Sequence, residues 1–192
     1  VVGASKVARD ITGQKRIERA LAAGGIQQKA LFHLAEQLQR ARTCDDVYSA
    51  ALDAVIDALR CHRASILLYD SDGVMRFVSS RGLSDTYCKG VEGHSPWQHG
   101  ERSPEPVYVN DAATAGFEES LTSLLKAEGI GALAFIPLVS HGMLIGKFMA
   151  YFNETHDFTL DEQELSLAIS RQLAFAIDRQ QTYLLQPKVT PR

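Results

Sequence analysis

Two hairpins constrain the fold of this chain more than any other sequence feature. The first spans residues 64–80 and turns at Ser71-Asp72-Gly73, and the second spans residues 131–152 and turns at Ser140-His141-Gly142. In each hairpin, two strand-like runs rich in Val, Ile, Leu and Phe flank residues that favour tight turns. Strands joined by so short a connection pair in antiparallel fashion. The sequence therefore predicts an antiparallel sheet.

Amphipathic helices are predicted before, between and after the hairpins. Apolar residues recur at helical spacing in residues 26–42, in residues 43–59, in residues 117–128 and after residue 159. Thr43 and Thr159 each precede a carboxylate by three residues, which is the capping-box pattern of a helix start. A short strand is expected at residues 107–109. This order of elements predicts an α+β fold in which the helices are segregated to the faces of the sheet.

Residues 81–106 form an irregular stretch rich in Gly, Ser, Pro and His, and it is longer than most connections in a compact domain. Long loops on a rigid scaffold often carry function. We therefore expect this stretch to lie over one face of the sheet as a lid whose order changes when a ligand binds. Within it, Ser95-Pro96 predicts a short helix that begins with Pro and whose N-terminus would suit an anion.

Four aromatic residues are candidates to face a cavity between the sheet and this lid, and one loop histidine joins them. The five candidate ligand-binding residues are Trp97, Tyr108, Phe135, Phe148 and His94. Small-molecule sites are mostly apolar with a few polar groups, and this set has that composition. Ordinary core packing is the alternative interpretation of each aromatic residue.

The cysteines and loop histidines predict no metal chemistry. Cys88, His94 and His99 lie near one another in sequence, but their spacing is not a zinc pattern and no fourth ligand is evident. We therefore expect no metal site, and the sequence requires no cofactor. Cys44, Cys61 and Cys88 are odd in number and have no paired spacing, which predicts reduced thiols in a cytoplasmic protein.

The composition argues against several classes of protein. Of the 192 residues, 45% are hydrophobic and 22% are charged, which is ordinary for a globular domain and unlike a disordered chain. The 20 Lys and Arg against 23 Asp and Glu give a net charge of −3, so neither nucleic acid nor an anionic membrane is expected as the main partner. The longest strongly apolar stretch, residues 132–139, is too short to cross a bilayer. Val1 stands where an initiator Met would, so we expect a piece of a longer protein.

The N-terminal residues resemble the end of a PAS domain. Asp10-Ile11-Thr12 followed by Gln14-Lys15-Arg16 is similar to the closing strand, turn and charged exit helix of that family. The resemblance implies that residues 1–25 are the remnant of a PAS domain with its linker helix, and that the rest of that domain lies upstream.

Four later segments, taken together and in order, resemble a GAF domain of bacterial sensor proteins. They are residues 63–69, residues 95–97 with 104–111, residues 136–138 with 142 and 144–146, and residues 158–165. The resemblance implies a GAF-like α+β fold over residues 26–185. Its antiparallel sheet would carry the N- and C-terminal helices on one face and a lid of loop and short helix on the other. Residues 186–192 would then be a linker to a missing output domain.

A PAS ending followed by a GAF domain resembles the input half of bacterial sensors, most often histidine kinases and next diguanylate cyclases or phosphodiesterases. The resemblance implies a cytoplasmic module that binds a small ligand or relays a signal to the kinase of a two-component phosphorelay. The output motifs of these enzymes are missing from the sequence, so no catalytic residue is expected and this chain is not expected to be an enzyme. Residues 171–185 alternate charged residues with Leu and Ile, which predicts a homodimer formed through the terminal helices.

Other uses of the GAF fold leave alternatives open. Some GAF domains reduce methionine sulfoxide with loop cysteines, although here only Cys88 lies in the loop. The cysteine that attaches a bilin is usually followed by His, whereas Lys89 follows Cys88. A GAF domain that binds nothing and serves only to dimerise is a further alternative. Cyclic-nucleotide GAF domains carry a set of residues of which this chain has Asn153, Phe158, Asp161 and Glu162, but with Glu154 in place of the lysine.

Overall fold

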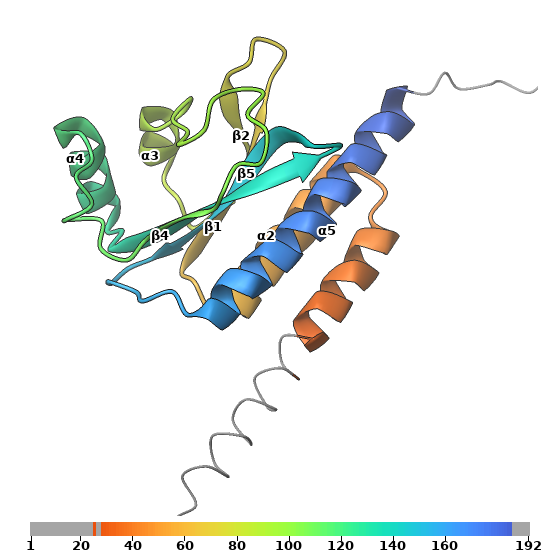
Figure 1. Cartoon of the computed structure of the whole chain (residues 1–192), viewed down its shortest axis with the longest axis horizontal. Coiled ribbons are helices and arrows are strands. Elements are labelled where there is room, and N and C mark those ends of the chain that lie inside the picture. Colours follow the sequence, from red (N-terminus) through yellow and green to blue (C-terminus); the bar gives the residue numbers. More distant parts are fainter. Residues whose placement is uncertain (1–24, 26–27, 186–192) are drawn as a thin grey trace, which may run out of the picture.

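The predicted α+β fold is confirmed by the structure, a computed structural model that describes residue 25 and residues 28–185. Within these residues, a five-stranded antiparallel sheet has the strand order β2-β1-β5-β4-β3 and is covered by helices (Figure 1). The strands are β1 (Arg63–Tyr69), β2 (Met75–Arg81), β3 (Val107–Val109), β4 (Ala132–Ser140) and β5 (Met143–Phe152). The helices are the first helix (residues 28–40), α2 (Cys44–Leu59), α3 (Asp85–Gly90), α4 (Glu119–Glu128) and α5 (Leu160–Leu185). Apart from Gly25, the proposed PAS remnant lies outside the described residues, as does the proposed C-terminal linker.

The two faces of the sheet are covered by different layers, as predicted. The first helix, α2 and α5 lie on one face, which we call the helix face (Figure 1). On the opposite face lie α4 and the lid, which we define as α3 with the loop of residues 91–106; this is the lid face. The core of the helix face joins Ile136 and Phe148 of the sheet to Ile169 of α5. The lid face has a separate, smaller core that includes Tyr87 of α3 and Leu125 of α4.

Capping boxes begin α2 and α5, as their sequences predict. The Thr43 hydroxyl accepts from the backbone N–H of Asp46 at 3.1 Å, and the Asp46 carboxylate accepts from the backbone N–H of Thr43 at 2.9 Å. Thr159 and Glu162 make the same reciprocal pair ahead of α5, at 3.3 and 2.8 Å. Each pair satisfies backbone donors that the first turn of a helix leaves unpaired.

Both hairpins turn at the predicted residues. His141 and Gly142 have φ values of 50° and 74°, and this left-handed pair matches the strand twist in a two-residue turn. At the other hairpin, the Asp70 carboxylate accepts from the backbone N–H groups of Asp72 and Val74, at 2.9 Å each. Gly73 supplies the positive φ that this turn needs, at 74°.

The short helix of the lid begins ten residues before the predicted one, so the helix expected at Ser95-Pro96 is wrong. The Ser95 hydroxyl instead accepts from the backbone N–H of Trp97 at 3.2 Å, a local turn that competes with a helix. The observed helix, α3, is capped by Ser84, whose hydroxyl accepts from the backbone N–H of Tyr87 at 3.1 Å. Burial of Tyr87 against the sheet anchors this helix.

Strand β5 lies in the middle of the sheet and pairs with β1 on one side and β4 on the other. At Gly146 the strands approach so closely that a Cβ atom would overlap the carbonyl oxygen of Leu67 and lie 3.0 Å from the Cα of Leu68. Both of these atoms belong to the backbone of β1, which cannot yield without breaking its pairing with β5. Glycine at this position is therefore a requirement of the sheet.

We expect Gly146→Ala to lower the free energy of unfolding by about 3 kcal/mol, because the added methyl group overpacks a buried strand pair. Urea denaturation of the purified chain measures this. Gly142→Ala is the control, because nothing lies within 4 Å of its Cβ position and only the positive φ is strained. That change should cost about 1 kcal/mol. Equal losses for the two variants would contradict the close approach at Gly146.

Candidate functional site

A small cavity lies beneath the lid, between the sheet and α4. Its walls come from β1, β2, β4 and β5 on one side and from α3, α4 and the lid loop on the other. The volume is about 30 Å³, and apart from Lys147 and His94 its lining side chains are apolar or aromatic. The space is about that of a single water molecule. We call it the lid cavity, and it lies where the sequence predicts a ligand site.

Lys147 of β5 places a buried amine in the wall of the lid cavity. The residue is only 2% exposed, and its Nζ donates to the backbone carbonyl of His94 in the lid at 2.6 Å. The same Nζ lies 5.1 Å from the centre of the Phe135 ring, within the range of a cation–π contact. Among the described residues, no carboxylate forms an ion pair with this amine. Burial alone therefore lowers the pKa of Lys147, from 10.5 to about 7.

Three of the five candidate ligand-binding residues lie in or near the lid. Phe135 and His94 line the lid cavity. Trp97 is buried in the lid loop, where its indole N–H donates to the carbonyl of Glu105 at 2.9 Å and its own carbonyl accepts from the Tyr69 hydroxyl at 3.4 Å. Trp97 thus fastens the loop to itself and to β1 without lining the cavity. The ligand-binding role of these three residues stays a prediction.

Tyr108 and Phe148 do not face the lid cavity, so the prediction that they line it is wrong. Both side chains pack on the helix face, where Phe148 is fully buried in the core. The Tyr108 hydroxyl lies 2.9 Å from the Ser166 hydroxyl of α5. Successive side chains of a strand point to opposite faces, so Phe148 must turn away from the lid when Lys147 and Met149 line the cavity.

Lys147 is the functional candidate that the sequence reasoning missed, although a signal for it exists. It is the only charged residue in the apolar run of residues 143–152, which forms a central strand. A lysine in such a strand is buried with it, and buried lysines are rare unless they are paired or functional. The hairpin pattern by itself does not mark this residue.

The loop thiol and the loop histidines lack the environment of a reactive or metal-binding site. Burial, with the nearby Glu128 and Asp85 carboxylates, raises the pKa of Cys88, which disfavours the nucleophilic thiolate. Cys44, Cys61 and Cys88 are all free thiols. Within residues 28–185 and residue 25, no group of three or more His, Cys, Asp or Glu side chains is arranged to hold a metal ion.

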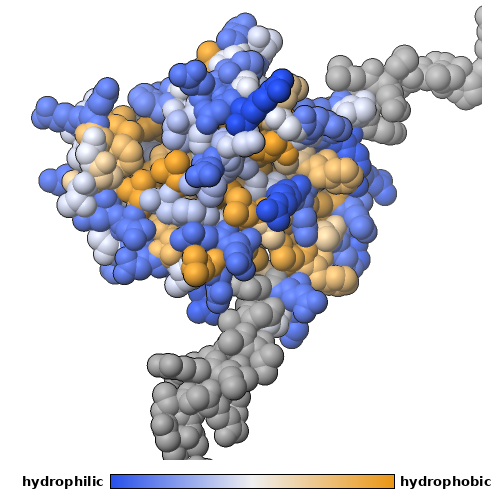
Figure 2. Space-filling view, viewed as in Figure 1, coloured by the Kyte–Doolittle hydropathy of each residue, from blue (hydrophilic) through white to orange (hydrophobic). Residues whose placement is uncertain are grey.

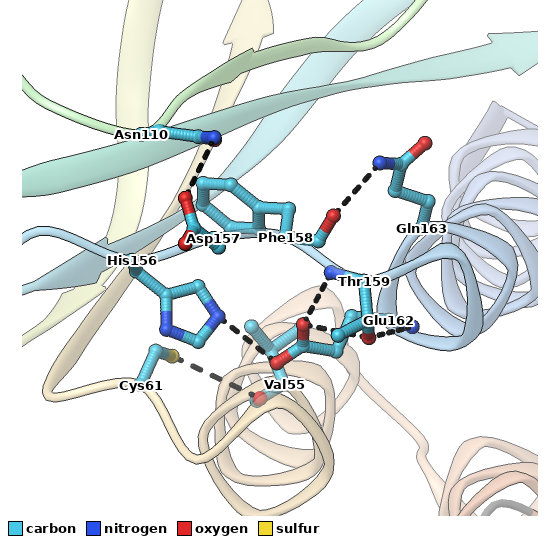
Figure 3. A network of polar contacts seen from close by, with 9 residues as sticks. All are labelled: Val55, Cys61, Asn110, His156, Asp157, Phe158, Thr159, Glu162 and Gln163. Atoms are coloured by element: carbon cyan, nitrogen blue, oxygen red, sulfur yellow. Dashed lines mark hydrogen bonds and ion pairs between the residues drawn. The ribbon is translucent and has the colours of Figure 1, made fainter.

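A larger, more open hollow of about 490 Å³ lies on the other side of the molecule, where the β5–α5 connection passes the end of α2. Three of its polar residues, His156, Thr159 and Glu162, are paired with one another. The His156 ring stacks on Phe152 with the centres 3.9 Å apart. The Nε2 of His156 lies 3.0 Å from the Glu162 carboxylate, as Figure 3 shows. Since Glu162 also caps α5, this hollow is better described as the anchor of that helix than as an empty binding site.

The β5–α5 connection is held at further points along its length. Asn110 at the end of β3 donates to the Asp157 carboxylate at 3.2 Å, and the Gln163 amide donates to the carbonyl of Phe158 at 3.1 Å (Figure 3). Asn153 accepts from Arg63 of β1 at 2.6 Å. Residues of the cyclic-nucleotide pattern, Asn153, Phe158 and Glu162, thus hold the connection and the helix start together.

With this geometry established, the comparisons with known proteins identify the family. The GAF domain family model matches residues 41–178, so the chain belongs to the GAF family. A domain assigned to a two-component sensor histidine kinase of Sinorhizobium meliloti 1021 is 46% identical, with a TM-score of 0.71 over 75% of this chain and 97% of that one. No curated protein sequence matches the chain.

More distant solved structures share the fold alone. The GAF domain of a phosphoenolpyruvate-protein phosphotransferase from Coxiella burnetii is 17% identical, with a TM-score of 0.68 over 83% of this chain and 97% of that one. The PixJ GAF domain of Thermosynechococcus elongatus, in its blue-light-absorbing form, is 16% identical, with a TM-score of 0.63 over 73% and 88%. In the part of this chain that the structure describes, every helix is too short or too polar to span a bilayer.

Lys147→Met should stabilise the protein at acidic and neutral pH, because Met fills similar space without a charge to desolvate. Folding lowers the pKa of Lys147 to about 7. Below that pH both the folded and the unfolded chain hold the proton, and the folded chain bears the whole desolvation cost. Between about 7 and the ordinary 10.5 only the unfolded chain holds it, so the stability of the wild-type protein rises with pH.

The variant should therefore unfold with a free energy roughly 1–4 kcal/mol above that of wild type near pH 6, and the gap should narrow towards pH 9. Urea denaturation at several pH values measures this. Lys126→Met removes an exposed lysine of α4 and serves as the control with little change. A Lys147→Met protein that is less stable than wild type near pH 6 would show that the buried amine is not destabilising.

Proposed function

We propose that this GAF domain is the sensory module of a bacterial two-component sensor histidine kinase, in the cytoplasm. In this proposal it binds a small molecule beneath the lid and relays occupancy through α5 to a kinase elsewhere in the parent protein. The observation that carries the proposal is the lid cavity with the buried, carboxylate-free Lys147 in its wall. The 46% identity to a domain assigned to a sensor histidine kinase supports the kind of parent protein.

A short route joins the lid cavity to α5. Lys147 lies opposite Pro137 in the register of β5 with β4, and the carbonyl of Pro137 accepts a hydrogen bond from the Ser170 hydroxyl of α5. A shift of β5 at Lys147 would thus reach α5 through one strand. This contact supports α5 as the output element of the proposed sensor.

Helix α5 and the first helix present an apolar surface that suits a second copy of the chain. They run side by side, with Arg179 donating to the carbonyl of Leu38 at 2.7 Å and Gln180 donating to that of Ala41 at 3.0 Å (Figure 1). Phe32 and Phe175 are 65% and 68% exposed on these helices. Hydrophobic residues interrupt the hydrophilic surface over this region (Figure 2).

A hollow of about 310 Å³ between the two helices adds to this argument. Gln172 of α5 lines it, and its Oε1 is a buried side-chain oxygen that finds no hydrogen-bond partner among the described residues. A partner helix would fill this hollow and cover its apolar side chains, Phe175 among them. We therefore propose a homodimer formed through the first helix and α5, in the manner of a helical bundle.

The domain organisation completes the proposal. Residues 26–185 form the GAF domain, residues 1–25 continue from a PAS domain, and residues 186–192 lead to the output domain. A diguanylate cyclase or phosphodiesterase as the parent protein is the alternative with the same geometry. A methionine sulfoxide reductase acting through Cys88 is disfavoured, because burial raises the pKa of that thiol.

Native mass spectrometry of the chain purified directly from cells tests the proposal. We expect a mass of two chains, with an additional small molecule on each before denaturation and none after it. A monomer without any bound molecule would contradict both the sensing and the dimer proposals. Turnover of methionine sulfoxide that is lost in Cys88→Ser would favour the enzyme alternative instead.

Changing either exposed aromatic residue should break the dimer. Phe175→Glu and Phe32→Glu each place a charge in the proposed interface. We therefore expect each to raise the dissociation constant of the dimer at least tenfold, which is a loss of about 1.4 kcal/mol in the free energy of association. Sedimentation equilibrium measures the dissociation constant. Val78→Glu adds the same charge at an exposed apolar residue of β2 and should leave dimerisation unchanged. Equal behaviour of the three variants would place the interface elsewhere.

Trp97→Ala should loosen the lid without unfolding the sheet. The change removes the indole N–H that is bonded to Glu105 and the bulk that buries the loop. We expect amide hydrogen exchange in residues 91–106 to speed up roughly fivefold or more, about the value of one lost hydrogen bond. Exchange in β4 and β5 is the internal control. Faster exchange throughout the chain would mean that Trp97 supports the whole domain rather than the lid.

A further inference from the structure

The chemistry of the lid cavity defines the class of molecule that it can hold. Of the described residues that line it, none is Asp or Glu, and Lys147 is the cation whose side chain is buried there. An anionic group in the cavity would meet one opposite charge and no like charge. A cationic group would meet the like charge of Lys147 and no opposite charge. The remaining walls are apolar or aromatic, so they favour a ligand with a hydrophobic body.

The number of donors at this position limits the charge of the ligand. An ammonium group has three N–H donors, and Lys147 directs its Nζ at the His94 carbonyl and lies beside the Phe135 ring. No arginine lines the cavity among the described residues, and recognition of a phosphate dianion usually needs several donors or a guanidinium. A carboxylate carries a single charge, which one ammonium group can balance.

Entry of a ligand must disturb the bond between Lys147 and the lid. The cavity of about 30 Å³ is smaller than any acid with a hydrophobic body, so the lid has to move to admit one. The lid is bonded to the Lys147 amine through the His94 carbonyl, which accepts a hydrogen bond from it. A carboxylate is a stronger acceptor than this neutral carbonyl. A carboxylate would therefore take the place of His94 and favour the state with the displaced lid.

We propose that Lys147 is the anchor for the carboxylate of a small, apolar carboxylic acid that binds beneath the lid in place of the His94 carbonyl. This inference rests on the proposed function and names the class of ligand for the same site. Such an acid supplies the negative charge that the described chain does not provide to Lys147, while its apolar body contacts Phe135 and the neighbouring hydrophobic side chains.

The test uses pairs of probes that differ only in charge: benzoate with benzamide, phenylacetate with phenylacetamide, and hexanoate with hexanamide. The full chain is titrated with each, and binding is followed by the fluorescence of Trp97, its only tryptophan, and by calorimetry. We expect at least one acid to bind roughly tenfold or more tightly than its amide, as a charge-assisted hydrogen bond implies. Lys147→Met should remove this preference, and Lys126→Met, which changes an exposed lysine of α4, should keep it.

These titrations test the anchor role of Lys147 separately from the presence of a ligand site beneath the lid. Acids and amides that bind equally well, or acid binding that persists in Lys147→Met, would overturn the anchor role while leaving a ligand site beneath the lid. If no acid binds the wild-type chain, the inference is also wrong, and the native mass spectrum decides separately whether the protein carries another molecule. Lys147→Met removes a desolvated charge, so the variant should stay folded. Its urea unfolding transition shows whether loss of binding comes from the missing amine or from unfolding.

Discussion

Both faces of strand β5 are covered, and its register with β1 and β4 decides which side chains meet the helices and which meet the lid. Phe148 and Ala150 pack on the helix face, whereas Lys147, Met149 and Tyr151 turn towards the lid. A slip of one residue would exchange the two sets and drive the lysine into the helical core. A buried contact between the two strands supports the register of β5 with β1: the Tyr151 hydroxyl of β5 lies 2.9 Å from the Ser65 hydroxyl of β1.

The same register brings the two ends of the proposed signal route together. Pro137, opposite Lys147, has no backbone N–H, but its carbonyl accepts from Ser170 of α5. At its far end β5 continues into the connection to α5, where His156 stacks on Phe152 of β5. His156 also contacts the capping residue Glu162 (Figure 3). Strand β5 thus contacts the lid at its middle and the start of α5 at its end. Suppose that β5 can take two positions. A ligand that binds the domain more tightly in one of them increases the population of that position, and the change reaches both the lid and the start of α5.

The elements of this fold could be predicted from the sequence where their signals are local. The capping boxes at Thr43 and Thr159 and the turn at His141 and Gly142 lie where predicted, because each is formed by neighbours in sequence. Helix α3 could not be predicted in this way, because six residues are too few to show helical periodicity and its Ser84 cap is the only local signal for it.

The orientation of the candidate site residues could not be predicted in the same way. A strand that is buried on both faces shows no alternation of polar and apolar residues, so the sequence does not tell which face Phe148 takes. For Tyr108 the strand is three residues long, and its orientation depends on the pairing of β3 with β4. Only the tertiary register resolves these cases, and it sends both side chains to α2 and α5 rather than to the lid.

The unbalanced charge of Lys147 is the feature of the site that packing does not explain. A methionine or leucine would fill the same space in β5 without removing an ammonium group from water, so the lysine costs stability in the chain by itself. One hydrogen bond to the His94 carbonyl and one aromatic ring offset only part of that cost. An anion that enters the lid cavity would offset the rest of that cost by pairing with the ammonium group, because the amine is already buried and positioned there. The energetic penalty of burying Lys147 and the proposed affinity for an acidic ligand would therefore both follow from the same residue.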